Sequence, residues 1–345
     1  MERSVACNIL PSKQRRAVKA SETDLIHKSY LDGQRLPVVV EPGIHQIDLA
    51  RWAETNRDFV DATLANVGAI LFRNFKIANV TQFESVIKAA CGELLKYTER
   101  SSPRSQVAGN VFTSTDYPAG QSIFLHTEQS YNYTFPLRIA FFCLTEPASG
   151  GETPIADTRR VLKRIRPETR ERFERLGYLY VRNFGSGIGL SWEEAFQTSD
   201  RKEVERHCRT SQIDFEWLPD GRLRTKQRRA VVAYHPSGAE AWFNHLTFFH
   251  VTTLEPDVRT HMLENFREED LPNNTYYGDG APIEAEVMDE LRGAYLAESL
   301  SFPWRTGDIL LLDNVLTAHG RAPFTAPRKV VVAMTSPCSW PEISK

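Results

Sequence analysis

Residues 124–132 read FLHTEQSYN, and residues 313–324 read DNVLTAHGRAPF. The first stretch carries His126 and Glu128 two positions apart, and the second carries His319. Two imidazoles and one carboxylate can bind one face of a divalent iron and leave the opposite face open. Side chains two residues apart in a β-strand point the same way, so His126 and Glu128 can share a metal if their stretch is extended. The two stretches therefore predict a metal centre and require a fold that brings them together.

Length and composition fit a soluble globular protein of one large or two ordinary domains. The chain has 345 residues, of which 41% are hydrophobic and 25% are charged. A formal net charge of −2 and a pI near 6.5 offer no basic surface for nucleic acid or an acidic membrane. No apolar run approaches the roughly 20 residues that span a bilayer. We expect neither nucleic acid nor a membrane as a partner.

The five cysteines are scattered along the chain and include no C-x-x-C pair. This pattern indicates neither a disulfide framework nor a thiolate metal site. The N-terminus also lacks the apolar stretch and cleavage site of a secretory signal. Reduced thiols in a cytoplasmic protein are the simplest interpretation.

Hydrophobic patterns predict both helices and strands. Helices are expected at about 48–66, 81–91, 157–176, from 191 onward, 256–266 and 283–298. Strands are expected at 69–72, 137–147, 178–184, within 213–243, at 309–312 and at 329–334. Serine at position 191 and glutamate at position 194 have the spacing of a capping box.

Strands at both ends of the chain, with helices between and before them, do not suit a doubly wound sheet. No G-x-G-x-x-G follows a strand, and no phosphate-binding G-x-x-x-x-G-K-[ST] occurs. The order favours a mainly β fold with helices, of the α+β class, with a double-stranded β-helix (jelly-roll) core. We expect a flexible N-terminal segment over residues 1–35 and one domain over residues 36–345. Helices precede its core, and a helical insertion occupies about residues 158–300.

Five motifs resemble the taurine dioxygenase and clavaminate synthase group of non-haem iron, 2-oxoglutarate-dependent oxygenases. They are LHTE followed by SYN, GGETPIAD (150–157), AWFNH (241–245), WRTGDILLLDN (304–314) and AHGRAPF…PRKVVVAM (318–334). The resemblance covers roughly residues 65–337. As a set these motifs are highly specific.

The resemblance implies roles for individual residues. His126, Glu128 and His319 correspond to the Fe(II) ligands. Arg328 corresponds to the arginine that binds the distal carboxylate of 2-oxoglutarate, although Arg321 is nearer to His319 and is an alternative. A guanidinium gives a bidentate, permanently charged match to a carboxylate. A hydroxyl that bonds the same carboxylate corresponds to Thr153, for which a purely structural role in a strand also stays open.

Polar residues around the metal are candidates for the substrate wall: Gln129, Ser130, Tyr131 and Asn244. Turn, cap and packing roles are equally open for these four. The FNH position of His245 is a further place where the substrate could be met, whereas Trp242 and Trp304 are expected in the core.

The function that the resemblance implies is hydroxylation of an unactivated C–H bond, with 2-oxoglutarate and O2 as cosubstrates of an Fe(II) enzyme. The motifs favour an amino-acid-derived substrate, free or tethered to a carrier protein, in specialised metabolism such as antibiotic biosynthesis. Desaturation, epoxidation, or action on a sulfonate or another small carboxylic acid are alternatives that use the same residues. A zinc hydrolase and a non-catalytic ligand-binding barrel are the less favoured alternatives. The sequence does not predict the oligomeric state.

Overall fold

The computed structural model describes residues 25–31, 33–44, 47–97, 99–101, 104–114, 117–185 and 187–344. Strand β1 (Ile26–Tyr30) pairs antiparallel with β2 (Val38–Pro42). The expected N-terminal segment of residues 1–35 therefore extends too far, because residues 26–30 already belong to a sheet. Residues 1–24 of that segment lie outside the described residues.

An eight-stranded sheet, ordered β1-β2-β3-β17-β7-β20-β5-β4, forms the centre of the described structure. Its further strands are β3 (Ala69–Phe72), β17 (Ile309–Asp313), β7 (Thr134–Thr145), β20 (Lys329–Ser339), β5 (Val111–Thr113) and β4 (Gln106–Ala108). Strand β17, ILLLD, is buried along its whole length. Ile309 and Leu311 belong to one apolar cluster, and Leu310 and Leu312 belong to another. This alternation means that both faces of the sheet are covered.

A second, four-stranded sheet packs on one of these faces. Its order is β16 (Ser299–Leu300), β9 (Ile155–Asp157), β18 (Thr317–Arg321) and β6 (Ile123–His126). One apolar cluster joins Ile155 of this sheet to Phe141, Leu310 and Val332 of the large sheet. Strand β18 is hydrogen-bonded on both edges, to β9 and to β6, and is therefore firmly positioned.

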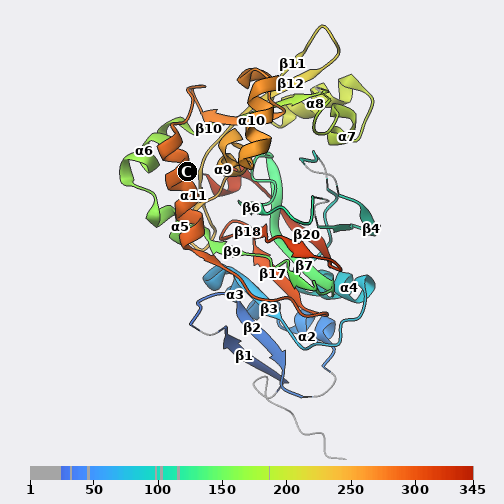
Figure 1. Ribbon diagram of the computed structural model, residues 1–345. Helices are drawn as coiled ribbons and strands as arrows, with labels where there is room; N and C mark the ends of the chain where they lie inside the picture. Colours follow the sequence, from blue (N-terminus) through green and yellow to red (C-terminus); the bar gives the residue numbers. More distant parts are fainter. Residues whose placement is uncertain are drawn as a thin grey trace, which may run out of the picture.

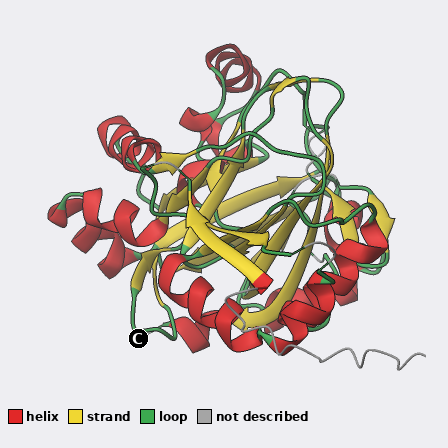
Figure 2. Ribbon diagram, turned by 90° about the horizontal axis from the view of Figure 1, so that it is seen from below, coloured by secondary structure: helices red, strands yellow, loops and turns green. Residues whose placement is uncertain are grey.

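Helices α2 (Leu49–Thr55), α3 (Arg57–Val67) and α4 (Val80–Cys91) cover the other face of the large sheet. Figure 2 shows helices around a centre of strands. The single helix expected at 48–66 is divided at Asn56, whose backbone is not helical (φ −122, ψ 32). The Asn56 side-chain amide donates to the Trp52 carbonyl at 2.8 Å, and this local bond competes with the helix.

The segment between β9 and β16 carries most of the remaining helices. Its elements are α5 (Thr158–Arg164), α6 (Pro167–Leu176), β10 (Tyr178–Phe184), α7 (Trp192–Phe196), α8 (Arg201–Thr210), β11 (Asp214–Trp217), β12 (Leu223–Arg229), β13 (Val232–Tyr234), β14 (Glu240–Trp242), α9 (Leu246–Phe249), the 3-10 helices η1 (Val251–Thr253) and η2 (Glu268–Asp270), α10 (Pro256–Asn265), β15 (Asn273–Tyr277) and α11 (Ala285–Ala297). Strands β11, β12, β10 and β15 form a sheet of their own. In Figure 1 this sheet, with α7, α8 and α10, lies at the end of the molecule opposite β1.

The helix expected at 157–176 is also divided. Proline at position 167 opens α6, and the residue before it, Arg166, has an extended backbone (φ −58, ψ 143). A proline disfavours the helical conformation in the residue before it, so one continuous helix cannot form. The expected capping box at the start of α7 is present.

Together these helices and large sheets make a mixed α/β structure. The remaining elements are β8 (Ser149–Gly150), β19 (Phe324–Thr325) and α12 (Trp340–Ile343). None of the helices in the described ranges has both the length and the apolar character needed to cross a membrane.

Candidate metal centre and adjoining cavities

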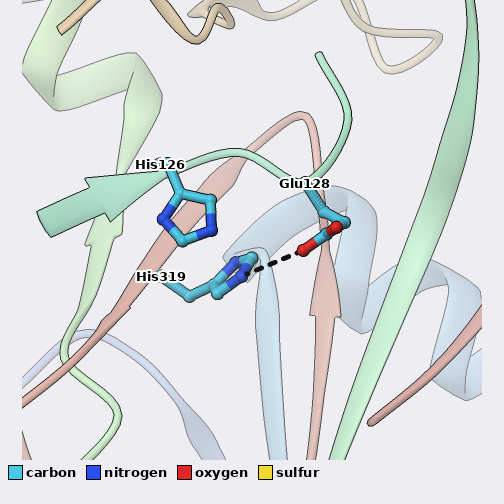
Figure 3. A group of neighbouring side chains, drawn as sticks. All are labelled: His126, Glu128 and His319. Carbon is cyan, nitrogen blue, oxygen red and sulfur yellow. Dashed lines mark ion pairs between the residues drawn. The ribbon is translucent and has the colours of Figure 1, made fainter. Parts of the chain in front are cut away.

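The side chains of His126, Glu128 and His319 converge, although His319 is far from the other two in the sequence. One ligand atom from each lies within 4.8 Å of the others, and Figure 3 shows the three side chains pointing toward one another. Strands β6 and β18 bring them together, because His126 and His319 are paired across the sheet. A Cβ on Gly320 would lie 2.6 Å from the carbonyl oxygen of Ile123, so glycine permits the close approach of these strands.

Strand alternation does not place Glu128, contrary to the expectation from its spacing to His126. Strand β6 ends at His126, and Glu128 begins a turn in which Gln129 has a φ of 54°. The side chain of Asn314 fixes this turn. Its Oδ1 accepts from the Glu128 backbone N–H at 2.7 Å, and its Nδ2 donates to the Glu128 carbonyl at 2.8 Å. The side-chain amide of Asn314, and not the pleat of a strand, therefore positions Glu128.

The hydrogen bond of His126 leaves one of its ring nitrogen atoms available to a metal. His126 Nδ1 lies 2.9 Å from the Phe124 carbonyl, so this nitrogen donates and Nε2 keeps its lone pair. Burial, assisted by His319, lowers the pKa of His126 to about 3, which keeps the ring neutral. His319 Nε2 lies 3.7 Å from Glu128 Oε2. Two imidazoles and one carboxylate fit a ferrous ion.

Arg104 forms a buried ion pair with Glu128. Its Nη2 donates to Glu128 Oε2 at 2.8 Å, and the two side chains are only 6% and 4% exposed. Burial favours a neutral carboxyl, but the charge of Arg104 outweighs it and holds the pKa of Glu128 well below its ordinary value. Glu128 is thus an anion at neutral pH. No sequence pattern points to Arg104, which follows a polar, serine-rich stretch.

A small cavity beside the histidines is lined by Thr153, Arg321 and Arg328 among others. Arg328 Nε donates to the Gly151 carbonyl at 2.8 Å, and Nη1 lies 3.4 Å from Ser114 Oγ. Burial, reinforced by the charge of Arg321, lowers the pKa of Arg328 to about 10. Arg328 therefore remains a cation at neutral pH, in surroundings that favour an anionic ligand.

The hydrogen bonds of Thr153 and Arg321 leave these two residues with different capacities to bind a ligand in this cavity. Thr153 Oγ1 accepts from Trp304 Nε1 at 3.1 Å, so its hydroxyl hydrogen stays available to a ligand. Arg321 instead donates to three backbone carbonyls, of Tyr117, Pro118 and Gln121, at 2.9, 2.6 and 2.9 Å. Arg321 therefore fastens the loop at 117–121.

A second, larger cavity of about 440 Å³ adjoins the same metal centre. Arg104, His126, Glu128 and His245 line its inner end. Apolar side chains from α9, η1, α10 and the neighbouring loops line much of the remainder: Phe248, Phe249, Val251, Leu254, Val258, Met262, Leu271 and Pro272. A cavity of this size and composition is typical of a site for an organic ligand.

The four candidates for the substrate wall are all buried: Gln129, Ser130, Tyr131 and Asn244. None of them is among the described residues that line either cavity. Ser130 Oγ lies 3.1 Å from His245 Nδ1, Tyr131 Oη donates to the Glu99 carbonyl at 3.0 Å, and Asn244 Nδ2 donates to the Val231 carbonyl at 3.1 Å.

These contacts place Ser130, Tyr131 and Asn244 behind the cavity wall, where Ser130 orients the ring of His245, which does face the cavity. His245 lines the larger cavity, at the FNH position singled out in the sequence. The tryptophans at 242 and 304 are buried, as expected.

Comparisons with known proteins agree with this geometry. The family model "Taurine catabolism dioxygenase TauD, TfdA family" matches residues 32–334. The chain is 44% identical over 279 residues to the dapdiamide synthesis protein DdaC of Enterobacter agglomerans, covering 81% of this chain and 85% of that protein. It is 29% identical over 332 residues to a clavaminate synthase-like protein of Arabidopsis thaliana, covering 91% and 97% of the two chains.

Solved structures show the same fold at low sequence identity. PvcB, described as an Fe, alpha-ketoglutarate dependent oxygenase from an isonitrile synthetic pathway, superposes with a TM-score of 0.54 at 15% identity, covering 96% of this chain and 100% of that chain. Another crystal structure of PvcB, from Pseudomonas aeruginosa, gives the same TM-score. AAD-2 in complex with Mn(II) and N-oxalylglycine gives a TM-score of 0.52 at 13% identity, covering 90% and 96% of the two chains.

Proposed function

The chain belongs to the taurine catabolism dioxygenase TauD, TfdA family, and from this premise we propose that it hydroxylates an unactivated C–H bond of an amino-acid-derived small molecule. It is an iron- and 2-oxoglutarate-dependent dioxygenase. The observation that carries the proposal is the convergence of two imidazoles and one carboxylate beside two cavities.

His126, Glu128 and His319 are the proposed iron ligands. When bound, Fe(II) with 2-oxoglutarate and O2 supplies the oxidising power that breaks a C–H bond, and succinate and carbon dioxide are released. His126 offers Nε2, because its Nδ1 is held by the Phe124 carbonyl. Glu128 offers a carboxylate that Arg104 keeps ionised. These residues hold the metal on one side, so the two cavities can present both cosubstrate and substrate to it.

Arg328 and Thr153 are the proposed partners of the distal carboxylate of 2-oxoglutarate. Arg328 is a half-buried cation that lines the small cavity, and the Thr153 hydroxyl hydrogen is available to donate to a carboxylate there. Arg321 serves less well, because three backbone carbonyls already engage its guanidinium. A charged, forked donor in a desolvated cavity favours a carboxylate strongly.

The substrate is proposed to derive from an amino acid and to belong to specialised metabolism. DdaC, at 44% identity, is named for dapdiamide synthesis, and PvcB serves an isonitrile synthetic pathway. The larger cavity, about 440 Å³, also accommodates more than a free small amino acid requires. A substrate tethered to a carrier protein stays within the proposal, as does a cytoplasmic location.

We also propose that the two packed sheets are the halves of a double-stranded β-helix, with the helical segment at about 158–300 as an insertion into one domain. Strands β6, β9 and β18 would form one half, opposite β7, β17 and β20. The metal ligands would then lie at the open end of the double sheet, where ligand sites of such barrels are common.

The test is incubation with Fe(II), 2-oxoglutarate and O2 across a panel of amino acids and their carrier-bound thioesters. We expect succinate release coupled to the gain of one oxygen atom by one member, read by mass spectrometry. Loss of two hydrogens instead identifies desaturation. Taurine is added to the panel as a sulfonate, and oxygen gain on taurine alone contradicts the substrate class. A product formed without O2 and with Zn(II) would establish a hydrolase.

A further inference from the structure

Arg104 is a buried cation with unused hydrogen-bond donors. Its side chain is 6% exposed. One donor of Nη2 is engaged by Glu128 Oε2 at 2.8 Å. Among the described residues, Nε and Nη1 have no hydrogen-bond partner. A guanidinium carries five N–H donors in a fixed plane, and leaving buried donors of a charged group unpaired is costly. The position therefore suits a ligand that brings an acceptor.

The guanidinium of Arg104 borders both cavities, and Ile123 and His126 are the other residues that the two linings share. It also lies over the ring of Tyr97, with its Cζ 4.8 Å from the ring centroid. One face of the Arg104 guanidinium is thereby covered, and the orientation of its plane is fixed. A hydrogen-bond acceptor that reaches Arg104 in this plane is consequently next to the metal centre.

The distal carboxylate of the cosubstrate is assigned to Arg328 and Thr153, in the small cavity, and this contact does not need Arg104. Within the described lining of the larger cavity, Glu128 and Glu255 are the acidic residues, and only Glu128 pairs with Arg104. No described carboxylate of that lining bonds Nε or Nη1 of Arg104.

Beyond Arg104 the larger cavity becomes apolar. Phe248, Val251, Met262 and Leu271 line it toward α10. A ligand that fits both ends carries an oxygen acceptor at its head and an extended, largely apolar remainder. An amino-acid derivative with a carboxylate or an amide carbonyl has this form.

We propose, on the basis of the function proposed above, that Arg104 binds an acyl oxygen of the primary substrate, from a carboxylate or a carbonyl, and so sets which carbon faces the metal. The contact with Glu128 fixes one side of the guanidinium, and the remaining N–H donors form hydrogen bonds with the substrate. Arg104 is thus a specificity-determining residue that is absent from the motifs of the sequence.

Three matched probes test this role: L-leucine, L-leucinamide and isopentylamine. The last two are both cations near neutral pH, and they differ only in the carboxamide. Binding is measured by anaerobic calorimetry on the full chain with Fe(II) and 2-oxoglutarate. We expect the wild-type protein to prefer at least one acyl probe over isopentylamine by about 10- to 100-fold, the range of a charge-assisted hydrogen bond.

Arg104→Met is expected to reduce that preference to near unity, and Arg104→Lys to retain part of it. The preference is a ratio within one protein, so a smaller folded fraction does not change it. Val258→Ala is the matched control, because Val258 lines the same cavity and carries no donor in its side chain. Val258→Ala should weaken the binding of all three probes by the same factor and leave the ratio of their affinities unchanged.

Equal binding of all probes to the wild-type protein, or no binding of any, overturns the inference. So does a preference that survives in Arg104→Met. If Arg104→Met instead weakens the binding of 2-oxoglutarate alone, the acceptor that bonds Arg104 belongs to the cosubstrate. The assignment of this acceptor to the primary substrate is then wrong. The proposed function fails separately, if the wild-type protein releases no succinate from 2-oxoglutarate with Fe(II) and O2. Whether L-leucine or L-leucinamide binds more tightly distinguishes a carboxylate from a carbonyl.

Discussion

The two cavities that meet at the metal centre are built from different parts of the molecule. The small cavity takes Thr153, His319 and Arg328 from strands β9, β18 and β20 or from the residue or two before them. The larger cavity takes most of its lining from the insertion, including α9, η1 and α10. Strand ladders fix side chains rigidly, whereas loops and short helices accept changes of sequence and length. We infer from this difference that the sheets hold the reaction centre, and that the insertion and Arg104 together select the substrate.

The largest effect is expected from a substitution in the metal centre that both cavities share. Glu128→Ala removes the anionic ligand and leaves the Arg104 cation unpaired in a buried place. We expect succinate release to fall by more than about 100-fold, since partners outside the ligands alone are worth about 10- to 100-fold. Anaerobic Fe(II) titration should show the same loss of metal affinity.

Glu255→Ala is the matched control for Glu128→Ala. Glu255 is a carboxylate of the larger cavity, but it is not part of the group of three. Its variant should retain Fe(II) binding. Unchanged succinate release in Glu128→Ala would show that the reaction does not depend on this centre.

The next effect separates the two arginines of the small cavity. Arg328→Ala should raise the KM for 2-oxoglutarate by about 10- to 100-fold, because charge-assisted hydrogen bonds contribute about 1.5–3 kcal/mol. Arg321→Ala should change this KM less and lower the urea midpoint of unfolding, because three carbonyls of the loop at 117–121 lose their donor. Succinate release against cosubstrate concentration measures the first effect. A larger KM change in Arg321→Ala would reverse the assignment of the two residues.

The sequence predicted the strand-borne half of the site better than the loop-borne half. The apolar run before His319 indicated a buried strand, and the strand that follows it, β18, pairs with β6 and so brings His319 to His126. Glu128 was identified for the wrong reason, because a long-range bond from Asn314 sets its turn. Such a bond joins residues that no local pattern connects.

Arg104 and the apolar lining of the larger cavity could not be predicted. Arg104 lies in a segment without periodicity, and its partner Glu128 is 24 positions away in the chain. Val258 and Met262 lie on α10, where a lining residue and an ordinary packed residue look alike in sequence. Loop-borne specificity is set by tertiary packing, which leaves no pattern in the sequence.

A smaller effect is expected at the mouth of the larger cavity. Val258 is 40% exposed and lines that cavity. Val258→Trp should narrow the passage and raise the KM for the primary substrate by up to about tenfold, corresponding to about 1 kcal/mol. The KM for 2-oxoglutarate should change less, because Val258 is not among the residues that line the small cavity. Equal changes in both constants would contradict the separation of the two cavities.

The smallest effect concerns the junction between the insertion and the segment that precedes Arg104. His207 of α8 bonds through Nε2 to Glu99 Oε2 at 2.9 Å, and Arg182 Nη1 lies 3.8 Å from Glu99 Oε1. The hydrogen bond with Glu99 raises the pKa of His207 above its ordinary value of 6.5, against the opposing effect of burial. The protonated form therefore stabilises the folded protein. This contribution is full below about pH 6.5 and is lost as the pH rises through the raised pKa.

His207→Ala should lower the free energy of unfolding by about 0.5–1 kcal/mol at about pH 6, because the pair is partly solvated. The deficit should shrink toward about pH 9, where wild-type His207 is neutral. Urea unfolding at both pH values measures it, with His207→Gln as the control that keeps a polar side chain but cannot titrate. A deficit that does not depend on pH would mean that the imidazole only packs. A deficit in His207→Gln confined to the lower pH would show that charge joins the insertion to the sheets, and that these two regions are coupled.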